Sequence, residues 1–263
     1  MARHPDLCLL GDDEAAPVRV LREAGGSGFF LTADHAGRAI PRRLGTLGLP
    51  EGERARHIAW DIGIAGVTEQ LSAMLDATAV LQPYSRLVID CNRGHGVDGS
   101  IPVVSETTEI PGNRDLLPDE RAARQREIFA PYHARIAALL DARARAGRRT
   151  VLVAMHSFTP VFKGEARPMH AGVLYNRDPR LARLLLGLLR AEGGLQVGDN
   201  APYSVSDSTD YTIPVHGEQR GLAHVGIEIR QDLIAGEAGQ AAWAARLAGL
   251  LREADAGLEK AGA

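Results

Sequence analysis

Phe29–Gly37, with the sequence FFLTADHAG, is a short apolar run that ends abruptly in polar, reactive residues. Such a run is typical of a buried strand, and Gly37 favours a turn directly after it. Three later segments share this design: Leu87–Ile89 leads into Asp90-Cys91-Asn92-Arg93, Val151–Met155 into His156-Ser157, and Val225–Ile227 into Glu228-Ile229-Arg230. In open α/β sheets, ligands bind outside the carboxyl ends of the strands. The pattern therefore predicts one pocket that gathers His35, Asn92, Arg93, His156 and Glu228.

The order of predicted elements indicates an α/β fold. Apolar runs alternate with helical stretches, which predicts three layers: a mostly parallel mixed sheet with helices on both faces. The expected helices are Glu51–Arg56, His57–Leu75, Asp119–Arg145 with a bend at Pro131, Pro179–Leu189 and Gln240–Lys260. Two long polar segments, Gly94–Leu117 and Val197–His216, are expected to be functional or covering loops. A length of 263 residues fits a single α/β domain over residues 1–263.

Composition excludes several classes of function. A formal net charge of −3 argues against a nucleic-acid partner. No segment approaches the roughly 18 apolar residues of a membrane span, and the N-terminus lacks the pattern of a signal peptide. Cys8 and Cys91, far apart, are expected to be reduced thiols, so we expect a cytoplasmic protein. The glycine-rich nucleotide loops and the G-x-S-x-G nucleophile turn are missing from the sequence.

His35 and His156 are candidate metal ligands because each follows a predicted parallel strand. Zinc in catalytic sites takes three protein ligands and leaves a fourth position for water. The alternative for each residue is a hydrogen-bonded structural histidine. The spacing leaves the third ligand open: Asp61 is the best carboxylate, and His57 competes with it from the same side of the expected helix. Another divalent ion remains an alternative to zinc.

Glu228 lies among apolar residues on a strand that should be central. A carboxylate there is costly unless it is paired or functional, so we expect a general base. The alternative is an ion pair with Arg230 on the same face of the sheet. Arg93 is suited to grip a substrate carboxylate, because its planar fork matches two oxygens, and Asn92 adds a directional donor and acceptor. Arg86 is either a second positive charge of the site or a surface residue.

Three further residues are candidate substrate contacts. Tyr211, His216 and Arg220 lie in or just after the second long polar segment, which is expected to fold over the pocket.

Several stretches in this order resemble the N-formylglutamate amidohydrolase family. The resemblance extends from about Phe29 to Trp243 and rests on LTADHAGRAIP, HIAWDIG, YSRLVIDCNR, TEIPGN, APYH, MHSFTPVFKGEARP, GVLYNRD, GDNAPYSVSD and HGEQRGLAHVGIEIRQDLI. It implies a phosphorylase/hydrolase-like sheet, similar to zinc carboxypeptidases and the aspartoacylase group, with one zinc at the strand ends.

The same resemblance implies roles for individual residues. His35 and His156 match zinc-ligand positions, Asn92-Arg93 matches the substrate-carboxylate clamp, and Glu228 matches a catalytic glutamate on a late strand. The family pattern places Glu three residues after the first histidine, where this chain has Arg38, so Asp61 becomes the expected carboxylate ligand.

These observations predict a zinc-dependent hydrolase of a small N-acyl, most simply N-formyl, amino acid with a free carboxylate, such as N-formylglutamate. Water activated by the metal and by Glu228 would attack the amide carbonyl, with Arg86 near the developing oxyanion. Two alternatives stay open: a zinc hydrolase of the same fold for another N-acyl amino acid or a peptide, and a non-catalytic binding domain. The sequence does not indicate an oligomeric state.

Overall fold

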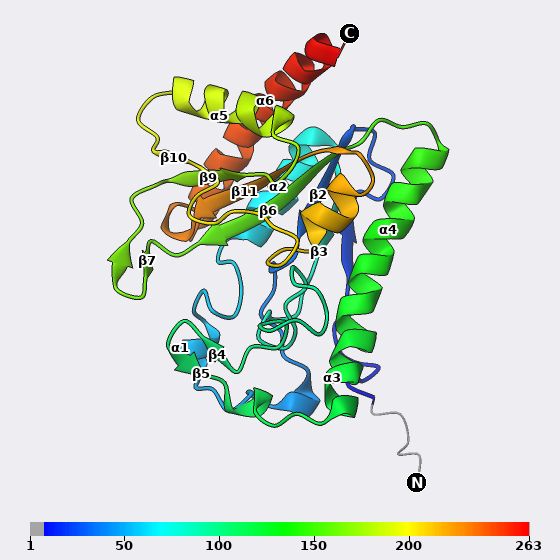
Figure 1. Ribbon diagram of the computed structural model, residues 1–263, viewed down its shortest axis with the longest axis vertical. Helices are drawn as coiled ribbons and strands as arrows, with labels where there is room; N and C mark the ends of the chain where they lie inside the picture. Colours follow the sequence, from blue (N-terminus) through cyan, green and yellow to red (C-terminus); the bar gives the residue numbers. More distant parts are fainter. Residues whose placement is uncertain (1–7, 263) are drawn as a thin grey trace.

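Strand β2, Phe29–Ala33, lies near the middle of a sheet that organises the molecule (Figure 1). The computed structural model describes residues 8–262. Within them, seven strands form this sheet in the order β1-β3-β2-β6-β11-β9-β10. The other strands are β1 Arg19–Leu21, β3 Thr78–Leu81, β6 Val151–Phe158, β9 Ala171–Leu174, β10 Val197–Asp199 and β11 Ala223–Arg230. Only the β1–β3 and β9–β11 neighbours are antiparallel, so the predicted mostly parallel sheet is confirmed.

Helices cover both faces of the sheet, as predicted. On one face lie α2 Ile64–Leu75, α5 Arg180–Ala191 and α6 Glu237–Gly262. On the other lies a continuous helical segment made of α3 Pro118–Arg124, the π-helical turn η3 Gln125–Phe129, and α4 Ala130–Arg145. The π-helical turn ends just before Pro131, which lacks an N–H for the regular helical hydrogen bond. No helix within residues 8–262 is long and apolar enough to cross a membrane.

The remaining elements are short and lie mostly in the connecting loops. They are η1 Arg42–Leu44, α1 Glu51–Arg54, η2 Pro111–Asn113, η4 Ile213–Glu218, η5 Gln231–Leu233, the hairpin β4 Val104–Ser105 with β5 Thr108–Glu109, and the hairpin β7 Val161–Phe162 with β8 Glu165–Ala166.

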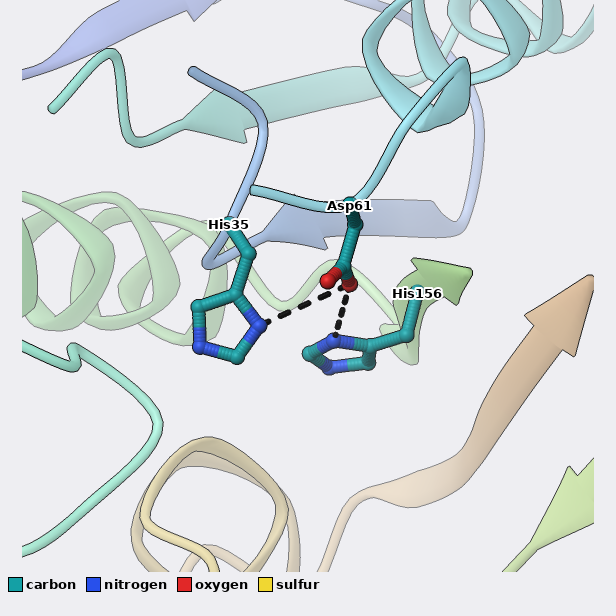
Figure 2. A group of neighbouring side chains, drawn as sticks. All are labelled: His35, Asp61 and His156. Atoms are coloured by element: carbon teal, nitrogen blue, oxygen red, sulfur yellow. Dashed lines mark hydrogen bonds and ion pairs between the residues drawn. The ribbon is translucent and has the colours of Figure 1, made fainter. Parts of the chain in front are cut away.

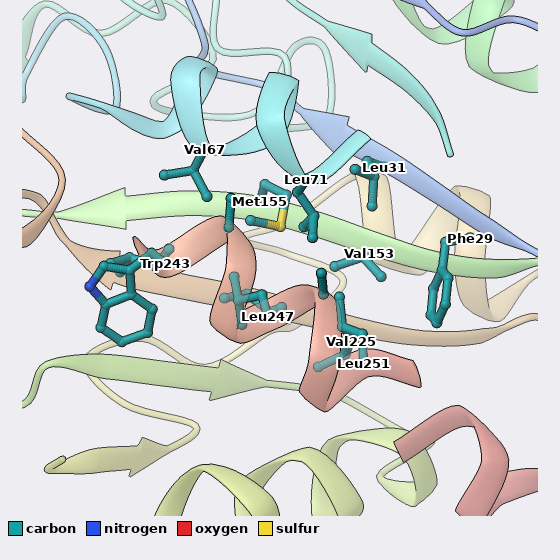
Figure 3. Packing of buried hydrophobic residues seen from close by; sticks show 14 of the residues in the cluster. Phe29, Leu31, Val67, Leu71, Val153, Met155, Val225, Trp243, Leu247 and Leu251 are labelled. Atoms are coloured by element: carbon teal, nitrogen blue, oxygen red, sulfur yellow. The ribbon is translucent and has the colours of Figure 1, made fainter. Parts of the chain in front are cut away.

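Alternation along the central strands decides which side chains face the helices. Val153 and Met155 of β6, with Val225 of β11, belong to the core under α2, α5 and α6 (Figure 3). Leu152 of β6 belongs instead to the core under α4. Because neighbours on a strand point to opposite faces, the even-numbered residues of β6 and β11 all face the α4 side. This places His156 and Glu228 on that side of the sheet.

The order of the strands reverses between β2 and β6. From β2 the chain crosses through α2 to β3, and it later returns through α4 to β6 on the other side of β2. Such a reversal separates two neighbouring strand ends and opens a crevice there. His35 follows β2 and His156 lies near the end of β6, so both stand beside this crevice.

The prediction of a strand at Leu87–Ile89 was wrong, because the segment is a buried turn. Its carbonyl groups are satisfied by side chains rather than by a neighbouring strand. Arg124 donates to the carbonyl oxygen of Val88 at 2.9 Å, and Asn113 donates to that of Leu87 at 2.8 Å. The apolar run thus correctly indicated that the segment is buried. It does not form a strand, because it does not reach a free edge of the sheet with which its backbone could pair.

The prediction of a helix from His57 was also wrong at its start, since α2 begins at Ile64. Gly63 precedes it with a φ of +82°, and a Cβ there would lie 2.1 Å from the carbonyl oxygen of Ile234. The residues before it form turns, so His57 and Asp61 do not share a helical face. This non-helical turn is what lets Asp61 reach toward the sheet.

We expect Leu71→Ala to lower the free energy of unfolding by about 2–5 kcal/mol, because Leu71 is fully buried between α2 and the sheet. Urea denaturation would measure the loss. Met74→Ala is the matched control on the same helix: Met74 is 41% exposed, so its change should stay within about 0.5 kcal/mol. Equal losses for the two variants would contradict the packing described here.

Candidate metal centre and active-site cavity

His35, Asp61 and His156 meet at the crevice between β2 and β6 (Figure 2). One ligand atom from each residue lies within 4.8 Å of the other two, and all three side chains are buried. Asp61 Oδ2 is 3.5 Å from His35 Nδ1 and 3.1 Å from His156 Nδ1. His35 Nδ1 is buried and has no hydrogen-bond partner. These residues can therefore hold a metal ion.

Asp61 is brought to this point by backbone contacts of its turn. Its N–H donates to the carbonyl oxygen of His35 at 2.9 Å, which ties the turn to the end of β2. The N–H of Ser157 donates to Asp61 Oδ2 at 3.2 Å. His57, the competing candidate, lies elsewhere in the cavity wall, with Nε2 3.5 Å from Glu106.

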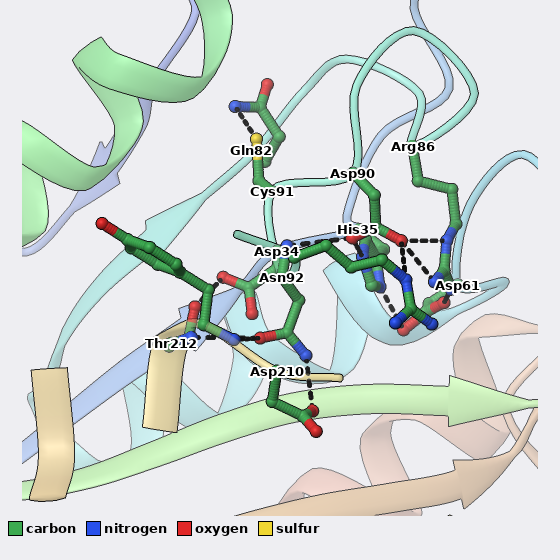
Figure 4. Close-up of polar contacts among 12 residues, drawn as sticks. Asp34, His35, Asp61, Gln82, Arg86, Asp90, Cys91, Asn92, Asp210 and Thr212 are labelled. Carbon is green, nitrogen blue, oxygen red and sulfur yellow. Dashed lines mark hydrogen bonds and ion pairs between the residues drawn. The ribbon is translucent and has the colours of Figure 1, made fainter. Parts of the chain in front are cut away.

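The second nitrogen of each histidine faces a carboxylate, and Figure 4 shows the pair of His35 and Asp90. His35 Nε2 lies 2.7 Å from Asp90 Oδ1, and His156 Nε2 lies 3.6 Å from Asp34 Oδ2. Histidines that bind metals commonly have such a partner, which fixes the ring and its tautomer. Sequence reasoning missed both roles, although Asp34 is adjacent to His35 and Asp90 ends the third apolar run.

Charge compensation favours the ionised forms of Asp61, Asp90 and His156, whereas burial raises the pKa of Asp34. Burial raises the pKa of Asp90, but the nearby Arg86 and His35 outweigh it, so the pKa lies well below its usual value. The pKa of Asp61 is likewise lowered, because His35 and His156 outweigh burial. Burial lowers the pKa of His156, yet Asp61 raises it overall to about 10. The site is thus built for opposite charges in close contact.

Glu228 lies beside His156, since the two residues are direct partners in the β6–β11 ladder. It lines the cavity, is only 6% exposed, and its Oε2 has no hydrogen-bond partner. Burial, assisted by Asp61 and opposed by His156, raises the pKa of Glu228 to about 7. The alternative partner, Arg230, instead binds Asp232 at 2.8 Å and nearby carbonyl groups. A carboxyl with this pKa suits proton transfer near neutral pH.

Arg86 and Arg93 both line the cavity and both face Asp90. Arg86 donates two hydrogen bonds to Asp90 Oδ2, at 3.1 and 2.6 Å. Arg93 Nε lies 3.7 Å from the same oxygen, and its Nη1 donates to the carbonyl oxygen of Thr209 at 3.1 Å. Arg86 is therefore part of the buried charge network and not a surface residue.

Asn92 also lines the cavity, but its side chain is engaged by the second long segment. Its Oδ1 accepts hydrogen bonds from the N–H groups of Tyr211 and Thr212, both at 3.1 Å, and its Nδ2 donates to Asp210 at 3.0 Å. The acceptor of this amide is thus used to position the loop, and one N–H at most remains for a ligand.

A cavity of about 860 Å³ opens in front of Glu228 and His156. Both long segments contribute to its wall, in agreement with the covering role predicted for them. Tyr203 is a lining residue that the sequence did not single out. Its hydroxyl accepts a hydrogen bond from Arg167 Nη1 at 2.7 Å, and because Arg only donates, the hydroxyl proton stays available for another acceptor. The stretch GDNAPYSVSD was the only sequence signal for it.

Tyr211, His216 and Arg220 do not lie in the wall of this cavity, so the structure does not support the predicted substrate contacts. Arg220 pairs with Asp141 of α4 at 2.5 Å. Tyr211 and His216 pack with Phe129 and His133 in an aromatic cluster under α4. The segment that carries them folds against the helix, which removes them from the pocket.

Within this cluster, His133 and His216 form a buried pair. His133 Nε2 lies 2.7 Å from the carbonyl oxygen of Cys91, which only accepts, so Nε2 carries the proton. His133 Nδ1 must then accept from His216 Nε2, 3.0 Å away. Burial lowers the pKa of His133 to about 3 and that of His216 to about 4. Both rings are therefore neutral in the folded protein.

The fold and the site define an α/β protein with a candidate metal centre and an unpaired carboxylate at its strand ends. The sequence model of the N-formylglutamate amidohydrolase family matches residues 27–235, and the chain belongs to this family. It is thus an amidohydrolase, an enzyme that hydrolyses amide bonds. No curated protein sequence matched the chain.

Two solved structures are similar to this chain over nearly its whole length. The gene product Atu2144 from Agrobacterium tumefaciens has a TM-score of 0.92 and 41% identity, with 95% of this chain and 99% of that chain covered. An N-formylglutamate amidohydrolase from Ralstonia eutropha JMP134 has a TM-score of 0.65 and 20% identity, with 92% and 98% covered. The second comparison supports the fold alone.

We expect the protein to lose stability as the pH falls from about 6.5 to about 4, because His133 and His216 take up protons only when it unfolds. Their unfolded-state pKa is 6.5, against about 3 and about 4 in the fold. Each contributes up to about 1.4 kcal/mol per pH unit in this window. Urea denaturation at a series of pH values measures the slope.

His216→Gln should make this slope shallower, since it removes one of the two groups. The control is His95→Gln, because His95 is exposed and should leave the slope unchanged. The same slope in His216→Gln and the unmodified protein would refute the explanation.

Proposed function

We propose that this amidohydrolase uses zinc to remove the formyl group from an N-formyl amino acid that carries a free carboxylate. N-formylglutamate, after which the family is named, is the first compound of this class to test. The observation that carries the proposal is the convergence of three buried ligand atoms beside the unpartnered carboxylate of Glu228. The products would be the free amino acid and formate.

The donor set fits zinc. Two imidazole nitrogens and one carboxylate oxygen match the three protein ligands of catalytic zinc sites. His35 Nδ1 has no other partner, and carboxylates stand behind both rings. A zinc ion bound there would lower the pKa of water and polarise the amide carbonyl.

Glu228 would handle the proton. It takes a proton from the attacking water and passes it to the nitrogen of the leaving amine, which a carboxyl with a pKa of about 7 does in both directions near neutral pH. Its place opposite His156 in the ladder holds it beside the metal centre. Its Oε2 has no hydrogen-bond partner among the described residues and can therefore accept this proton.

The arginines would hold the substrate. Arg93, whose side chain is 32% exposed, presents its guanidinium in the cavity and would bind the substrate carboxylate. Arg86 would stabilise the negative charge that develops on the carbonyl oxygen. Asn92 would position the loop that closes the cavity. The cytoplasmic location and the lack of nucleic-acid partners stay predictions from composition.

We expect the purified protein to bind about one zinc ion per chain. His156→Ala should weaken zinc binding more than about 100-fold, since it removes a ligand and not only a supporting partner. Competition with a zinc chelator of known affinity provides the measurement. His95→Ala serves as the control, and unchanged zinc affinity in His156→Ala would refute the site.

Glu228→Gln should keep zinc but lose about 10²–10⁴-fold in the rate of formate release, because glutamine cannot accept the proton. Metal content and formate release are measured on the same preparation. Glu237→Gln, at an exposed position on α6, is the matched control. Full turnover by Glu228→Gln with normal zinc content would disprove the assigned role.

A further inference from the structure

The face of the sheet beside His156 and Glu228 carries small residues that line the cavity. Ala154 and Gly226 stand two residues before His156 and Glu228 on the same strands, and they are direct partners in the β6–β11 ladder. Residues two apart on a strand share a face. Two small residues thus lie next to His156 and Glu228 on this face of the sheet.

Apolar side chains surround these small residues in the cavity wall. Leu174, Val205 and Ile213 group with Ala154 into a hydrophobic cluster that is separate from the two large cores, and all four line the cavity. Leu174 of β9 is the ladder partner of Gly226 from the other side. We call these residues, with Gly226, the apolar subsite.

The side chains around Gly226 are tightly packed. A Cβ built on Gly226 would lie 3.1 Å from Ile213 Cδ1 and 3.1 Å from Leu174 Cβ, so these two side chains pack closely over Gly226 and an added methyl group would displace them. Beside it, Glu228 is 6% exposed and leaves Oε2 without a partner, which indicates that a ligand belongs in front of these strands.

The apolar subsite offers no cation to a second substrate carboxylate. Among the described lining residues are five carboxylates, Asp90, Asp98, Glu106, Asp210 and Glu228, against two arginines. Both arginines face Asp90 and come from the turn that follows β3, whereas the walls of the apolar subsite carry no charge. One carboxylate of a substrate can be met by Arg93, but a second one in the subsite would lose its hydration without gaining a cation.

We propose that the apolar subsite takes the side chain of the substrate, and that the preferred substrates are N-formyl amino acids with an aliphatic side chain. N-formylleucine represents this class, in contrast to the dicarboxylate N-formylglutamate. The inference rests on the proposed function, since it assigns one part of the same cavity.

The zinc-loaded protein tests this with four compounds: N-formylleucine, N-formylglutamate, the neutral N-formylglutamine and N-formylglycine. We expect kcat/KM to be at least roughly tenfold higher for N-formylleucine than for the other three, because an apolar pocket rewards each buried methylene group. If the protein hydrolyses none of the four compounds, the proposed function is wrong. Turnover in which N-formylglutamate or N-formylglycine equals or exceeds N-formylleucine overturns only the apolar subsite.

The variant Gly226→Ala tests whether a change in the subsite affects only substrates with a side chain. Its added methyl group should reduce kcat/KM for N-formylleucine about tenfold relative to N-formylglycine, which places no side chain there. Equal losses on both compounds would contradict the proposal. Gly187→Ala, on the exposed side of α5 where a Cβ meets no atom within 4 Å, is the matched control.

Leu174→Ala provides a second readout that does not depend on Gly226→Ala being folded. The shorter side chain should enlarge the subsite and shift the preference from N-formylleucine toward N-formylphenylalanine. An unchanged ratio of the two kcat/KM values would overturn the assignment of Leu174 to the subsite.

Discussion

The register between β6 and β11 is the constraint on which the site depends. It places His156 opposite Glu228 and, two residues earlier, Ala154 opposite Gly226. A slip of either strand by one residue would turn its reactive side chain into the opposite core. The alternating residues that face α2, α5 and α6 prevent this, because Val153, Met155, Val225 and Ile227 are fully buried. Packing on one face thereby fixes the chemistry on the other.

Hydrogen bonds extend this precision from the sheet to the layers around it. Asp34, which stands behind His156, accepts from Tyr132 of α4 at 2.7 Å and from Thr212 of the covering segment at 2.9 Å. Asp90, which stands behind His35, accepts from the N–H of Asn92 at 2.9 Å. A helix, a turn and a loop are thus connected to the same two imidazoles. Such supporting contacts orient the rings and strengthen them as ligands.

The sequence pattern predicted which residues at strand ends come together in the structure. His35, His156 and Glu228 were predicted because apolar runs are visible in the sequence and parallel strands end at one edge. The prediction of Asp61 assumed a helix that begins at His57. The structure has a turn there instead, and this turn places the Asp61 carboxylate beside His35 and His156. The prediction of a strand at Leu87–Ile89 was wrong because an apolar run indicates that a segment is buried but not whether it pairs with a strand.

The residues of the covering segments were the hardest to place. Tyr211 and His216 turn toward α4 through contacts with Phe129 and His133, which are about 80 residues away in sequence. No local pattern encodes such a choice, since it depends on which surface a long loop meets. Tyr203 and the walls of the apolar subsite were missed for the same reason.

The turn at Leu87–Ile89 has a consequence for how this architecture diversifies. Its carbonyl groups are held by Arg124 and Asn113 rather than by the sheet, so the arginines beside it belong to a separately stabilised cover. In the proposed mechanism, proton handling resides in the strands, and the substrate carboxylate is held by the cover. We therefore expect mutations and insertions in the cover to change which substrate carboxylate is held while the reaction stays the same. The sheet and the cover are thus stabilised by different contacts although they belong to one chain.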